Sequence, residues 1–367
     1  MKVEFVDLKM QYEKIKSDID NAIREVISSS TFIGGPFLKS FERNFSQFVS
    51  VRHCIGVSNG TDALFIALKV LGIKEGDEVI TAANSFIATS EAVTMLGAKV
   101  VFVDCDKDTY NIDVHQIEKS ITSKTKAIIP IHLYGQPAEM DRIIDLAKTY
   151  NLYIIEDAAQ AHGAVYKDRN VGTMGDVACF SFFPGKNLGA YGDAGALVTN
   201  NDEIAKKARM FANHGRVDKY DHEFEGINSR LDSLQAAILD VKLRYLGEWN
   251  ERRREIAQKY DEMLGDVVVI PKAFSSVRHV YHLYVIRIKD RDNVKEKLSK
   301  HGISTGIHYP IPLPFLKAYG YLAHQPENFP VAYSLKDEIL SLPIHGNMTD
   351  EQVMYVVDHL RNALKKL

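Results

Sequence analysis

Lys186 is the residue whose neighbours most clearly suggest chemistry. It lies in the stretch 180–195, after a run of aromatic residues and among four glycines. A lysine is ordinarily a solvated surface charge, but these apolar and glycine neighbours allow a flat ligand to lie close to it in a partly dry site. Desolvation lowers the pKa of an amine from roughly 10.4 and exposes a nucleophile that forms Schiff bases. The loop therefore predicts carbonyl chemistry at an amine.

A second candidate is the start of an expected helix within 58–64, where a glycine turn is followed by an apolar run. The amides of Gly60 and Thr61, together with the positive end of the helix dipole, suit a phosphate group. The structural alternative is that Thr61 or Asp62 only caps the helix. The segment has neither GxGxxG spacing nor a Walker-type lysine, so dinucleotide and nucleoside-triphosphate sites lose their usual support.

The third candidate is the acidic pair Glu156 and Asp157, which ends an apolar run. A carboxylate at that place either neutralises a cationic atom of a ligand or caps the following helix. Metal chemistry is the poorer alternative, because none of the 13 histidines stands in HxH or HExxH spacing. The three cysteines are isolated along the chain, and we expect them to be buried and reduced in a cytoplasmic protein with no metal site.

The elements that must position these residues alternate along the chain. Apolar residues recur every three or four positions over 8–26, which predicts an amphipathic helix. From about residue 50, β-rich runs alternate with helical patterns, which is typical of a parallel sheet covered on both faces. Such sheets bind ligands at the carboxyl ends of their strands, where all three candidates fall. The expected strands are 78–81, 99–104, 127–132, 152–157, 177–182 and 196–199, with helices at 85–97, 114–121 and 140–150.

The pattern changes near residue 232 and predicts a second, smaller α/β domain. Residues 232–264 contain no proline and one glycine, so we expect a single long helix, bent at Gly247, that connects the domains. The predicted domains are 1–245, a large α/β domain, and 246–367. In the second domain the expected elements are strands at 282–288 and 303–308, helices at 293–301 and 350–364, and a proline-rich loop at 309–314.

Composition narrows the class of protein. The chain has 367 residues, 45 basic and 48 acidic, for a net charge of −3, which argues against a nucleic-acid partner. The one dense basic run, 252–254, has acidic neighbours and is expected on a solvated helix face. No apolar stretch approaches the roughly 20 residues that span a bilayer. The first seven residues carry too many charges for a signal peptide, so no membrane partner is expected.

Taken in order, the motifs resemble the fold-type I pyridoxal-phosphate enzymes, and among them the nucleotide-sugar aminotransferases of the DegT type. The resemblance covers nearly the whole chain and implies a large domain with a mostly parallel, seven-stranded type of sheet flanked by helices. Any one motif is weak, but the ordered set is specific. The motifs lie at 32–36, 59–64, 76–80, 156–163, 180–195, 228–232, 308–310 and 341–343.

The resemblance implies a role for each residue around the cofactor ring. Lys186 would hold pyridoxal 5'-phosphate as a Schiff base and then act as acid and base in the proton transfer that leads to pyridoxamine phosphate. Asp157 would pair with the protonated pyridine nitrogen, which keeps the ring an electron sink. Gln160 would bond the phenolic oxygen of the ring, and Phe86 would stack on its face.

The resemblance also implies how the phosphate and the partner are bound. The amides of Gly60 and Thr61 and the hydroxyl of Ser181 would hold the cofactor phosphate. In this family an asparagine from the second subunit also reaches that phosphate, and it maps to Asn228. A homodimer with shared active sites is therefore expected. Without the family, Phe86, Ser181 and Asn228 are ordinary core or turn residues.

Two features of the sequence bear on the substrate. Lys186 favours transamination, since related sugar dehydratases carry histidine at that position. The sequence of residues 186–193 resembles that of enzymes that aminate a 3-keto sugar. Enzymes that aminate C4 of the sugar more often have a threonine-rich stretch after the lysine. This implies a nucleotide-linked, dTDP-type 3-keto-6-deoxyhexose, with L-glutamate as donor, for a surface-polysaccharide precursor. His308 and Tyr309 are candidate substrate contacts, although Pro314 replaces the histidine that the family's loop commonly has.

Other functions remain open on the sequence alone. Within the enzymes they are a sugar 4-aminotransferase, a pyridoxal-phosphate-dependent dehydratase or a carbocycle-forming synthase. From another class comes a regulator or structural protein that binds the cofactor without exchanging an amine with glutamate.

Overall fold

The computed structural model describes residues 1–274 and 276–365 and places a seven-stranded sheet at the centre of the molecule. The strand order is β1-β9-β8-β5-β4-β2-β3, and β9 is antiparallel to both of its neighbours while the other pairs along the sheet are parallel. The predicted mostly parallel α/β fold is therefore confirmed. The strands are β1 His53–Val57, β2 Glu78–Ala82, β3 Lys99–Val103, β4 Thr125–Ile129, β5 Tyr153–Asp157, β8 Val177–Ser181 and β9 Gly195–Thr199.

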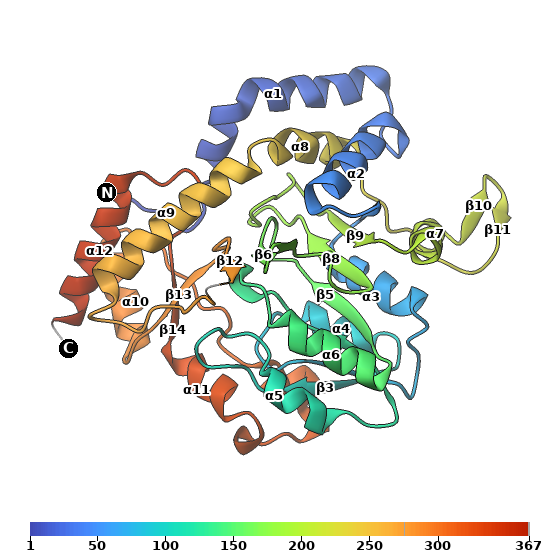
Figure 1. Ribbon diagram of the computed structural model, residues 1–367. Helices are drawn as coiled ribbons and strands as arrows, with labels where there is room; N and C mark the ends of the chain where they lie inside the picture. The colour runs from blue at the N-terminus through green and yellow to red at the C-terminus, as the bar shows by residue number, and fades with distance from the viewer. Residues whose placement is uncertain (275, 366–367) are drawn as a thin grey trace.

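Helices cover both faces of this sheet (Figure 1). The strands β2, β5 and β9 are almost wholly buried, as continuous apolar runs between two helical layers must be. In Figure 1, α5 and α6 lie in front of the sheet while α3 and α4 lie behind it. The helices around the sheet are α1 Leu8–Ser29, α2 Gly35–Val49, α3 Gly60–Val70, α4 Ala88–Thr94, α5 Val114–Ile117, α6 Met140–Tyr150, α7 Asp202–Phe211 and α8 Ser233–Leu243.

The predicted helix at 85–97 is too long, and the difference matters for the site. Only α4, Ala88–Thr94, is helical, and the residues between β2 and α4 form a turn that contains Phe86. Phe86 is 54% exposed in that turn rather than packed on a helix face. Its ring is therefore free to contact other groups at the carboxyl edge of the sheet.

The single long helix predicted over 232–264 is wrong. The chain forms α8 and then α9, Leu246–Leu264, and the break lies at Arg244 and Tyr245, whose amides bond carbonyls only three residues back. Tyr245 stacks on Trp249 at 5.9 Å and donates to Asp18 at 2.8 Å, so tertiary contacts hold the break. Gly247, where a bend was expected, lies inside α9.

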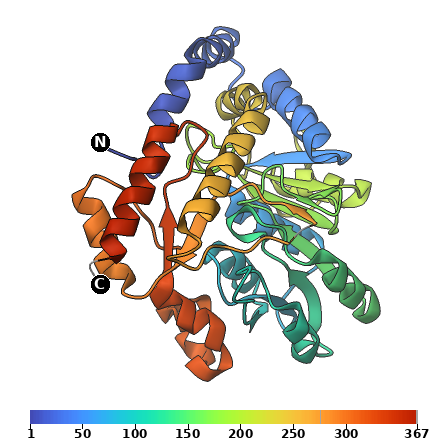
Figure 2. The same ribbon diagram turned by 60° about the vertical axis from the view of Figure 1, so that its left-hand side comes forward.

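The C-terminal residues form a smaller unit beside the sheet (Figure 2). Its strands β13 Tyr284–Arg287 and β14 Ile339–Leu342 are antiparallel, and its helices are α10 Arg291–Lys300 and α12 Asp350–Leu364. The predicted strand at 303–308 is wrong: Ile303 and Gly306 make only isolated bridges, to Val3 and Ser341. The partner of β13 is instead β14, a four-residue apolar run that the sequence reading did not identify.

Two segments pack against the unit to which they do not belong in sequence. Val3 is buried in the apolar cluster of the smaller unit, together with α9 and α12. In the other direction, residues between Leu313 and Leu335, including the start of α11, Pro330–Glu338, pack into the core of the large sheet. The N-terminal segment and α11 thus tie the two units together, and the domain boundary at residue 245 remains a prediction.

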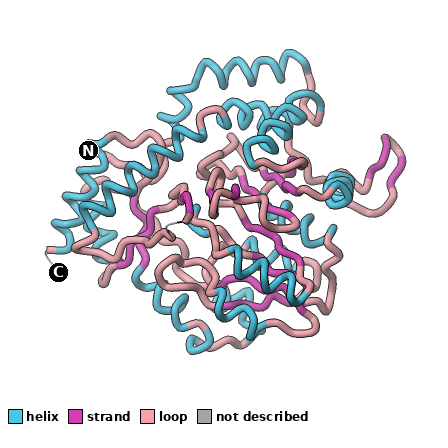
Figure 3. Tube along the Cα trace, in the orientation of Figure 1, coloured by secondary structure: helices cyan, strands magenta, loops and turns pink. Residues whose placement is uncertain are grey.

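Two further small β-structures lie outside the central sheet. The short strands β6 Val165–Tyr166, β7 Arg169–Asn170 and β12 Val277–Arg278 form a three-stranded sheet. The hairpin β10–β11, Arg216–Asp218 and Asp221–His222, projects away from the body (Figure 3). Among the described residues, no helix has the length and apolar character needed to cross a membrane.

The basic run at 252–254 departs from the predicted solvated face. Arg253 is only 4% exposed and donates to the carbonyl of Ile344 at 2.7 Å, while Arg252 bonds the carbonyl of Met348. These contacts link α9 to the chain after β14. The run of three basic residues did not show that its middle arginine, Arg253, donates to buried carbonyl groups.

Candidate active site

The three segments singled out in the sequence meet at the carboxyl edge of the sheet. Asp157 ends β5 and Ser181 ends β8, and these two strands are parallel neighbours. Gly60 begins α3 directly after β1, which runs in the same direction as β8 with β9 between them. Because parallel strands end on one side, the geometry expected from the sequence is confirmed for these three segments.

The start of α3 and the end of β8 approach each other closely and form a cradle of polar groups. A Cβ atom added at Gly60 would lie 2.6 Å from the Cβ of Ser181 and 3.2 Å from its hydroxyl oxygen, so glycine is required for this close approach. Asn59, and not Thr61 or Asp62, caps the helix by accepting from the amide of Asp62 at 2.8 Å. The first amides of a helix have no partner within it, so those of Gly60 and Thr61 remain as donors beside the Ser181 hydroxyl.

Asp157 is buried and only partly satisfied. Its side chain is 5% exposed, and it accepts from the hydroxyl of Thr89 at 2.7 Å and from the amide of Ala159 at 3.2 Å. A carboxylate has about four acceptor positions, so capacity remains for a further donor. Thr89 was not identified from the sequence, because a threonine within a short helix carries no local signal of a partner 68 residues away.

Lys186 lies within the electrostatic reach of Asp157 in a dry environment. Burial lowers the pKa of Lys186 to about 8, although the negative charge of Asp157 acts in the opposite direction. The backbone of the loop is folded back on itself, with the amide of Lys186 donating to the carbonyl of Phe183 at 2.8 Å. At pH 7 about a tenth of this amine is uncharged, far more than for an ordinary lysine, and the uncharged form is the one that attacks a carbonyl carbon.

Three histidines around Lys186 are held neutral. Burial is the largest influence on each, and the neighbouring charge of Lys186 adds to it: the pKa is lowered to about 3 for His162, to about 4 for His308, and well below its ordinary value for His282. His162 lies between the rings of Phe180 and Phe182, and neither of its nitrogens has a partner among the described residues. No imidazolium therefore competes with Lys186 for Asp157.

Gln160 has a fixed orientation that presents a donor to the site. Its carbonyl oxygen accepts from the amide of Tyr134 at 2.6 Å, and its amide nitrogen donates to the hydroxyl of Tyr309 at 3.2 Å. One N–H of that amide is left for another acceptor. The ring of Phe86 lies 5.9 Å from that of Tyr309, so residues from three segments enclose the space in front of Asp157.

Residues 308–309 are held by contacts to both units of the protein. The hydroxyl of Tyr134 donates to the carbonyl of His308, and the imidazole Nδ1 of His308 lies 2.9 Å from the hydroxyl of Ser341 in β14. Burial raises the pKa of Tyr309 above its ordinary value, so its hydroxyl keeps its proton and can act as a donor. Tyr134 was missed in the sequence reading, since its only signal was a place after an apolar strand.

Asn228 is not in the group around Lys186. It is exposed and lines a hollow of about 430 Å³ with Ser58, Asp193, Arg230 and other residues. Its neighbour Ser229 donates to the carboxylate of Asp62 at 2.6 Å, which anchors the segment beside the start of α3. Within the part of the chain that the structure describes, Asn228 is thus presented at the surface near the cradle.

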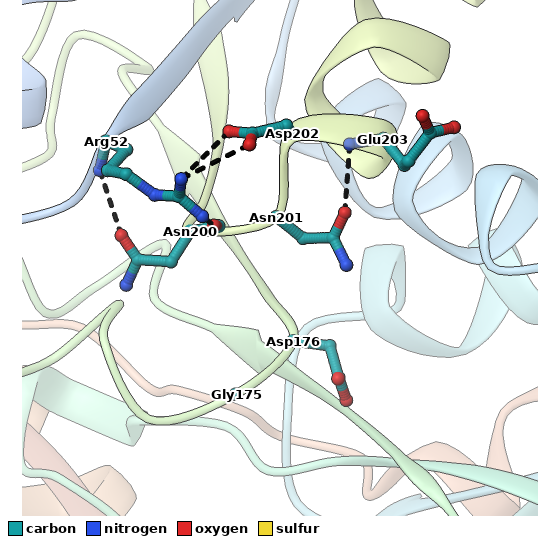
Figure 4. A pocket seen from close by; sticks show the side chains of 7 residues that line it. All are labelled: Arg52, Gly175, Asp176, Asn200, Asn201, Asp202 and Glu203. Atoms are coloured by element: carbon teal, nitrogen blue, oxygen red, sulfur yellow. Dashed lines mark hydrogen bonds and ion pairs between the residues drawn. The ribbon is translucent and has the colours of Figure 1, made fainter.

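A larger hollow, of about 490 Å³, lies at the opposite edge of the sheet, before β8 begins and after β9 ends (Figure 4). Its cation, Arg52, is already paired with Asp202 at 3.1 Å, and Asn201 is occupied in capping α7. None of the residues identified from the sequence lines it. Size alone therefore does not mark the active site in this molecule.

The residues present fit pyridoxal phosphate. The cradle that a Cβ at Gly60 would fill offers neutral donors to a phosphate, and Asp157 offers an open acceptor to a protonated ring nitrogen. Gln160 offers a donor to a ring oxygen, and Lys186 offers an amine to the aldehyde. Each polar group of the cofactor thus meets a complementary group at the same edge of the sheet.

Comparison with known proteins agrees with this chemistry. The model of the DegT/DnrJ/EryC1/StrS aminotransferase family matches residues 13–361. A pleiotropic regulatory protein of Geobacillus stearothermophilus is 46% identical over 98% of this chain and 98% of its own. The dTDP-3-amino-3,6-dideoxy-alpha-D-galactopyranose transaminase of Aneurinibacillus thermoaerophilus is 45% identical over 97% of this chain and 98% of its own.

Solved structures extend the likeness to three dimensions. The crystal structure of S. venezuelae DesV in complex with a ketimine intermediate superposes with a TM-score of 0.98 at 41% identity, covering 100% of this chain and 99% of that one. A putative sugar aminotransferase from Streptococcus pneumoniae, solved in a pyridoxamine phosphate form and a pyridoxal phosphate form, superposes with a TM-score of 0.90 at 28% and 27% identity, covering 95% of this chain and 96% of that one. The chain therefore belongs to the DegT/DnrJ/EryC1/StrS aminotransferase family and is a pyridoxal-phosphate-dependent aminotransferase with the type I fold.

Proposed function

We propose that this aminotransferase moves an amino group from L-glutamate to C3 of a dTDP-linked 3-keto-6-deoxyhexose, for the synthesis of a deoxyamino sugar. The observation that carries the proposal is Lys186, a half-buried amine with a pKa of about 8 that faces Asp157 beside a phosphate cradle. The relative from A. thermoaerophilus, named for a dTDP-3-amino-3,6-dideoxy sugar, supports the substrate class. A 3-keto rather than a 4-keto sugar is supported by the resemblance of residues 186–193 to enzymes that aminate 3-keto sugars.

The bound cofactor supplies an aldehyde and an electron-withdrawing ring. Lys186 would hold the cofactor through its Nζ and, once released, would carry a proton on that atom as acid and base. Asp157, whose carboxylate is oriented by the Thr89 hydroxyl, would keep a proton on the ring nitrogen. The amides of Gly60 and Thr61 and the hydroxyl of Ser181 would hold the phosphate.

The side chains of residues 160 and 309 orient the ring and the sugar. Gln160, which donates to the hydroxyl of Tyr309, would donate its other N–H to the oxygen of the cofactor ring. Phe86, whose ring lies 5.9 Å from that of Tyr309, would stack on the face of the cofactor ring. His308, kept neutral, and Tyr309, kept protonated, would bond the oxygens of the sugar. Pro314 stands where the family's loop commonly has histidine, so the sugar contacts of this loop would differ from the common pattern.

We also propose that the working unit is a homodimer with shared active sites. Asn228 is exposed beside the start of α3 and is not in contact with Lys186 in its own chain. Phe32 and Ile33, which are about half exposed, lie close by, because Ile33 lines the same hollow. An apolar and amide-bearing surface of this kind suits a second copy, in which Asn228 would complete the partner's phosphate site.

The test is the absorption spectrum of the protein loaded with pyridoxal phosphate, before and after L-glutamate, for the wild type and Lys186→Ala. We expect the band of the lysine-bound cofactor to disappear with glutamate in the wild type and never to form in the variant. Turnover should be abolished in Lys186→Ala while its melting temperature stays near that of the wild type. Full activity of the variant would refute the role of Lys186.

The same experiment separates the other functions. A lysine-bound cofactor that ignores glutamate and other amino acids would indicate a regulator, as the relative from G. stearothermophilus is named, or a dehydratase. If glutamate is consumed, 3-keto and 4-keto sugars linked to dTDP and UDP are compared as acceptors. Preference for a 4-keto or a UDP-linked sugar would overturn the proposed substrate and leave the amine exchange intact.

A further inference from the structure

A second lysine, Lys242, is buried close to the loop that carries Lys186. Lys242 lies on α8, which runs beneath α1 in Figure 1, and its side chain has no exposed surface. Its Nζ donates to the carbonyl of Gly189 and lies 4.8 Å from the centre of the Tyr191 ring. Burial lowers its pKa to about 7, and it forms no ion pair with any described residue.

Such a residue is costly to keep, because an amine buried without a carboxylate loses its hydration. Its two contacts are both in the loop, three and five residues after Lys186. A lysine that only filled space could be replaced by an apolar residue of similar length. The buried amine thus indicates that something in the loop needs a donor at this place.

The same helix binds the loop at a second point. Gln235 lies two turns before Lys242, so both side chains share one face of α8. The side-chain oxygen of Gln235 accepts from the amide of Tyr191 at 2.8 Å, and its nitrogen donates to the carbonyl of Tyr191 at 3.3 Å. The helix therefore fixes the backbone at residues 189–191 by three hydrogen bonds.

The loop leaves little room for another arrangement. A Cβ atom at Gly189 would lie 2.3 Å from the carbonyl oxygen of Pro184, so the chain crosses itself closely there. The amide of Ala190 donates to the carbonyl of Phe182 at 2.8 Å and closes the loop around Lys186. The Gly189 carbonyl points out of this closed loop toward Lys242. A change at residue 242 is thus transmitted to the backbone on which Lys186 stands.

We propose that Lys242 is a positioning residue for the reaction, and that its amine, held between the Gly189 carbonyl and the Tyr191 ring, sets the position of Lys186. The proposal rests on the proposed role of Lys186 as the residue that binds the cofactor. Lys242 does not touch the cofactor or the substrate in this arrangement. It acts through the loop.

The test uses Lys242→Met, which keeps an unbranched side chain as far as the Cε position and removes the amine. The rate at which the apo protein binds pyridoxal phosphate covalently is followed by absorbance. We expect it to fall about 10- to 100-fold, as for a misplaced reacting group. Amide hydrogen exchange over 186–192 should become faster. The matched control is Lys297→Met, which removes another lysine-to-carbonyl bond, to Ala363, and should leave both measurements unchanged.

Variants of Tyr191 show whether the two contacts act together. Tyr191→Phe keeps the ring and should behave as the wild type, whereas Tyr191→Leu should slow cofactor binding and should add little to Lys242→Met in the double variant. If Lys242→Met does not fold, Tyr191→Leu alone carries the test. A wild-type rate in a folded Lys242→Met or Tyr191→Leu protein would overturn the proposal. If the Lys186→Ala protein still bound pyridoxal phosphate covalently, the proposed role of Lys186 would itself be refuted.

Discussion

Two neighbouring regions of this molecule contain the same kinds of charged group, but in one region these groups have all their hydrogen-bond partners and in the other they do not. On one side of β5, Glu156 is fully buried and each carboxylate oxygen has two donors: the amides of Met174 and Gly175, and the amide of Gly172 with the imidazole of His132. On the other side, the next residue, Asp157, accepts from two donors among the described residues. The first carboxylate is saturated and the second is open.

Lys186 and Lys242 repeat this contrast. The amine of Lys242 is bound to Gly189 and covered by a tyrosine ring, whereas that of Lys186 faces Asp157 and the neutral histidines. Saturated groups hold backbone segments in place, and open groups are left to bind a ligand. Adjacent residues of one strand can therefore have unrelated functions, and the number of satisfied donors and acceptors distinguishes them better than residue type does.

His132, which is hydrogen-bonded to Glu156, supports a purely structural role for that carboxylate. The amide of Ala138 donates to Nδ1 of His132 at 3.1 Å, so that nitrogen carries no proton and the imidazole is neutral. Nε2 then donates to Glu156 at 3.0 Å. Burial alone would raise the pKa of Glu156, but the bonds from His132 and from the glycine amides hold it below its ordinary value. The carboxylate stays charged and binds the 172–175 turn.

Replacing the saturated carboxylate should have the largest effect on stability. In Glu156→Gln the new amide nitrogen faces two donors. Because a hydrogen bond to a charged group contributes about 1.5–3 kcal/mol, we expect the free energy of unfolding of the apo protein to fall by at least about 3 kcal/mol. Denaturant unfolding measures this, and amine exchange by the protein that remains folded should change little.

The control for this prediction is Glu42→Gln. Glu42 is also buried, but the amide of Gly56 and the guanidinium of Arg209 both bond the same oxygen, Oε1. A glutamine can keep an oxygen there and turn its nitrogen away, so the loss should be smaller. Equal losses in the two variants would mean that saturation of both oxygens is not what distinguishes Glu156.

Replacing the open carboxylate, Asp157, should have a large effect on turnover and a small effect on stability. Asp157→Asn keeps the shape and an acceptor for Thr89 but removes the charge that holds a proton on the ring nitrogen. We expect turnover to fall about 10²- to 10³-fold, as when one preorganised electrostatic partner is removed. Unfolding free energy should change by about 1 kcal/mol. Steady-state kinetics and denaturant unfolding of the same preparation check both parts, and a variant that loses stability but keeps its turnover would reverse the assignment.

The sequence predicted the open groups better than the saturated ones. Lys186, Asp157, Gly60 and Ser181 belong to local motifs, and a parallel sheet brings the ends of its strands together whatever the loops contain. Glu156 belongs to the same motif as Asp157, but nothing in the motif showed which of the two is saturated, and Lys242 gave no signal at all, since the partners of both lie in other segments of the chain. The break at Tyr245 and the strand β14 were missed for the same reason, because contacts distant in sequence determine both.

Gly60→Ala tests how closely the cradle is built. The added Cβ would approach the Cβ of Ser181 to 2.6 Å, so α3 must move away from β8 by a fraction of an ångström. We expect the dissociation constant for pyridoxamine phosphate, which binds without Lys186, to rise about 10- to 100-fold. Titration by fluorescence measures it. Gly247→Ala, at a position where nothing lies within 4 Å of an added Cβ, is the matched control and should bind normally.

The smallest expected effect is the pH dependence of the free amine of Lys186. Only the uncharged amine attacks the aldehyde, and with a pKa lowered to about 8 its uncharged fraction rises as the pH increases through that value. From pH 7 to pH 9 this fraction increases about tenfold, and the rate of covalent binding of pyridoxal phosphate to the apo protein should follow it. In Asp157→Asn the midpoint should move to lower pH, since the charge that favours the ammonium is gone. A midpoint near 10 in the wild type would show that Lys186 is solvated in the apo protein, and the contrast with Lys242 would then have to rest on hydrogen bonding alone.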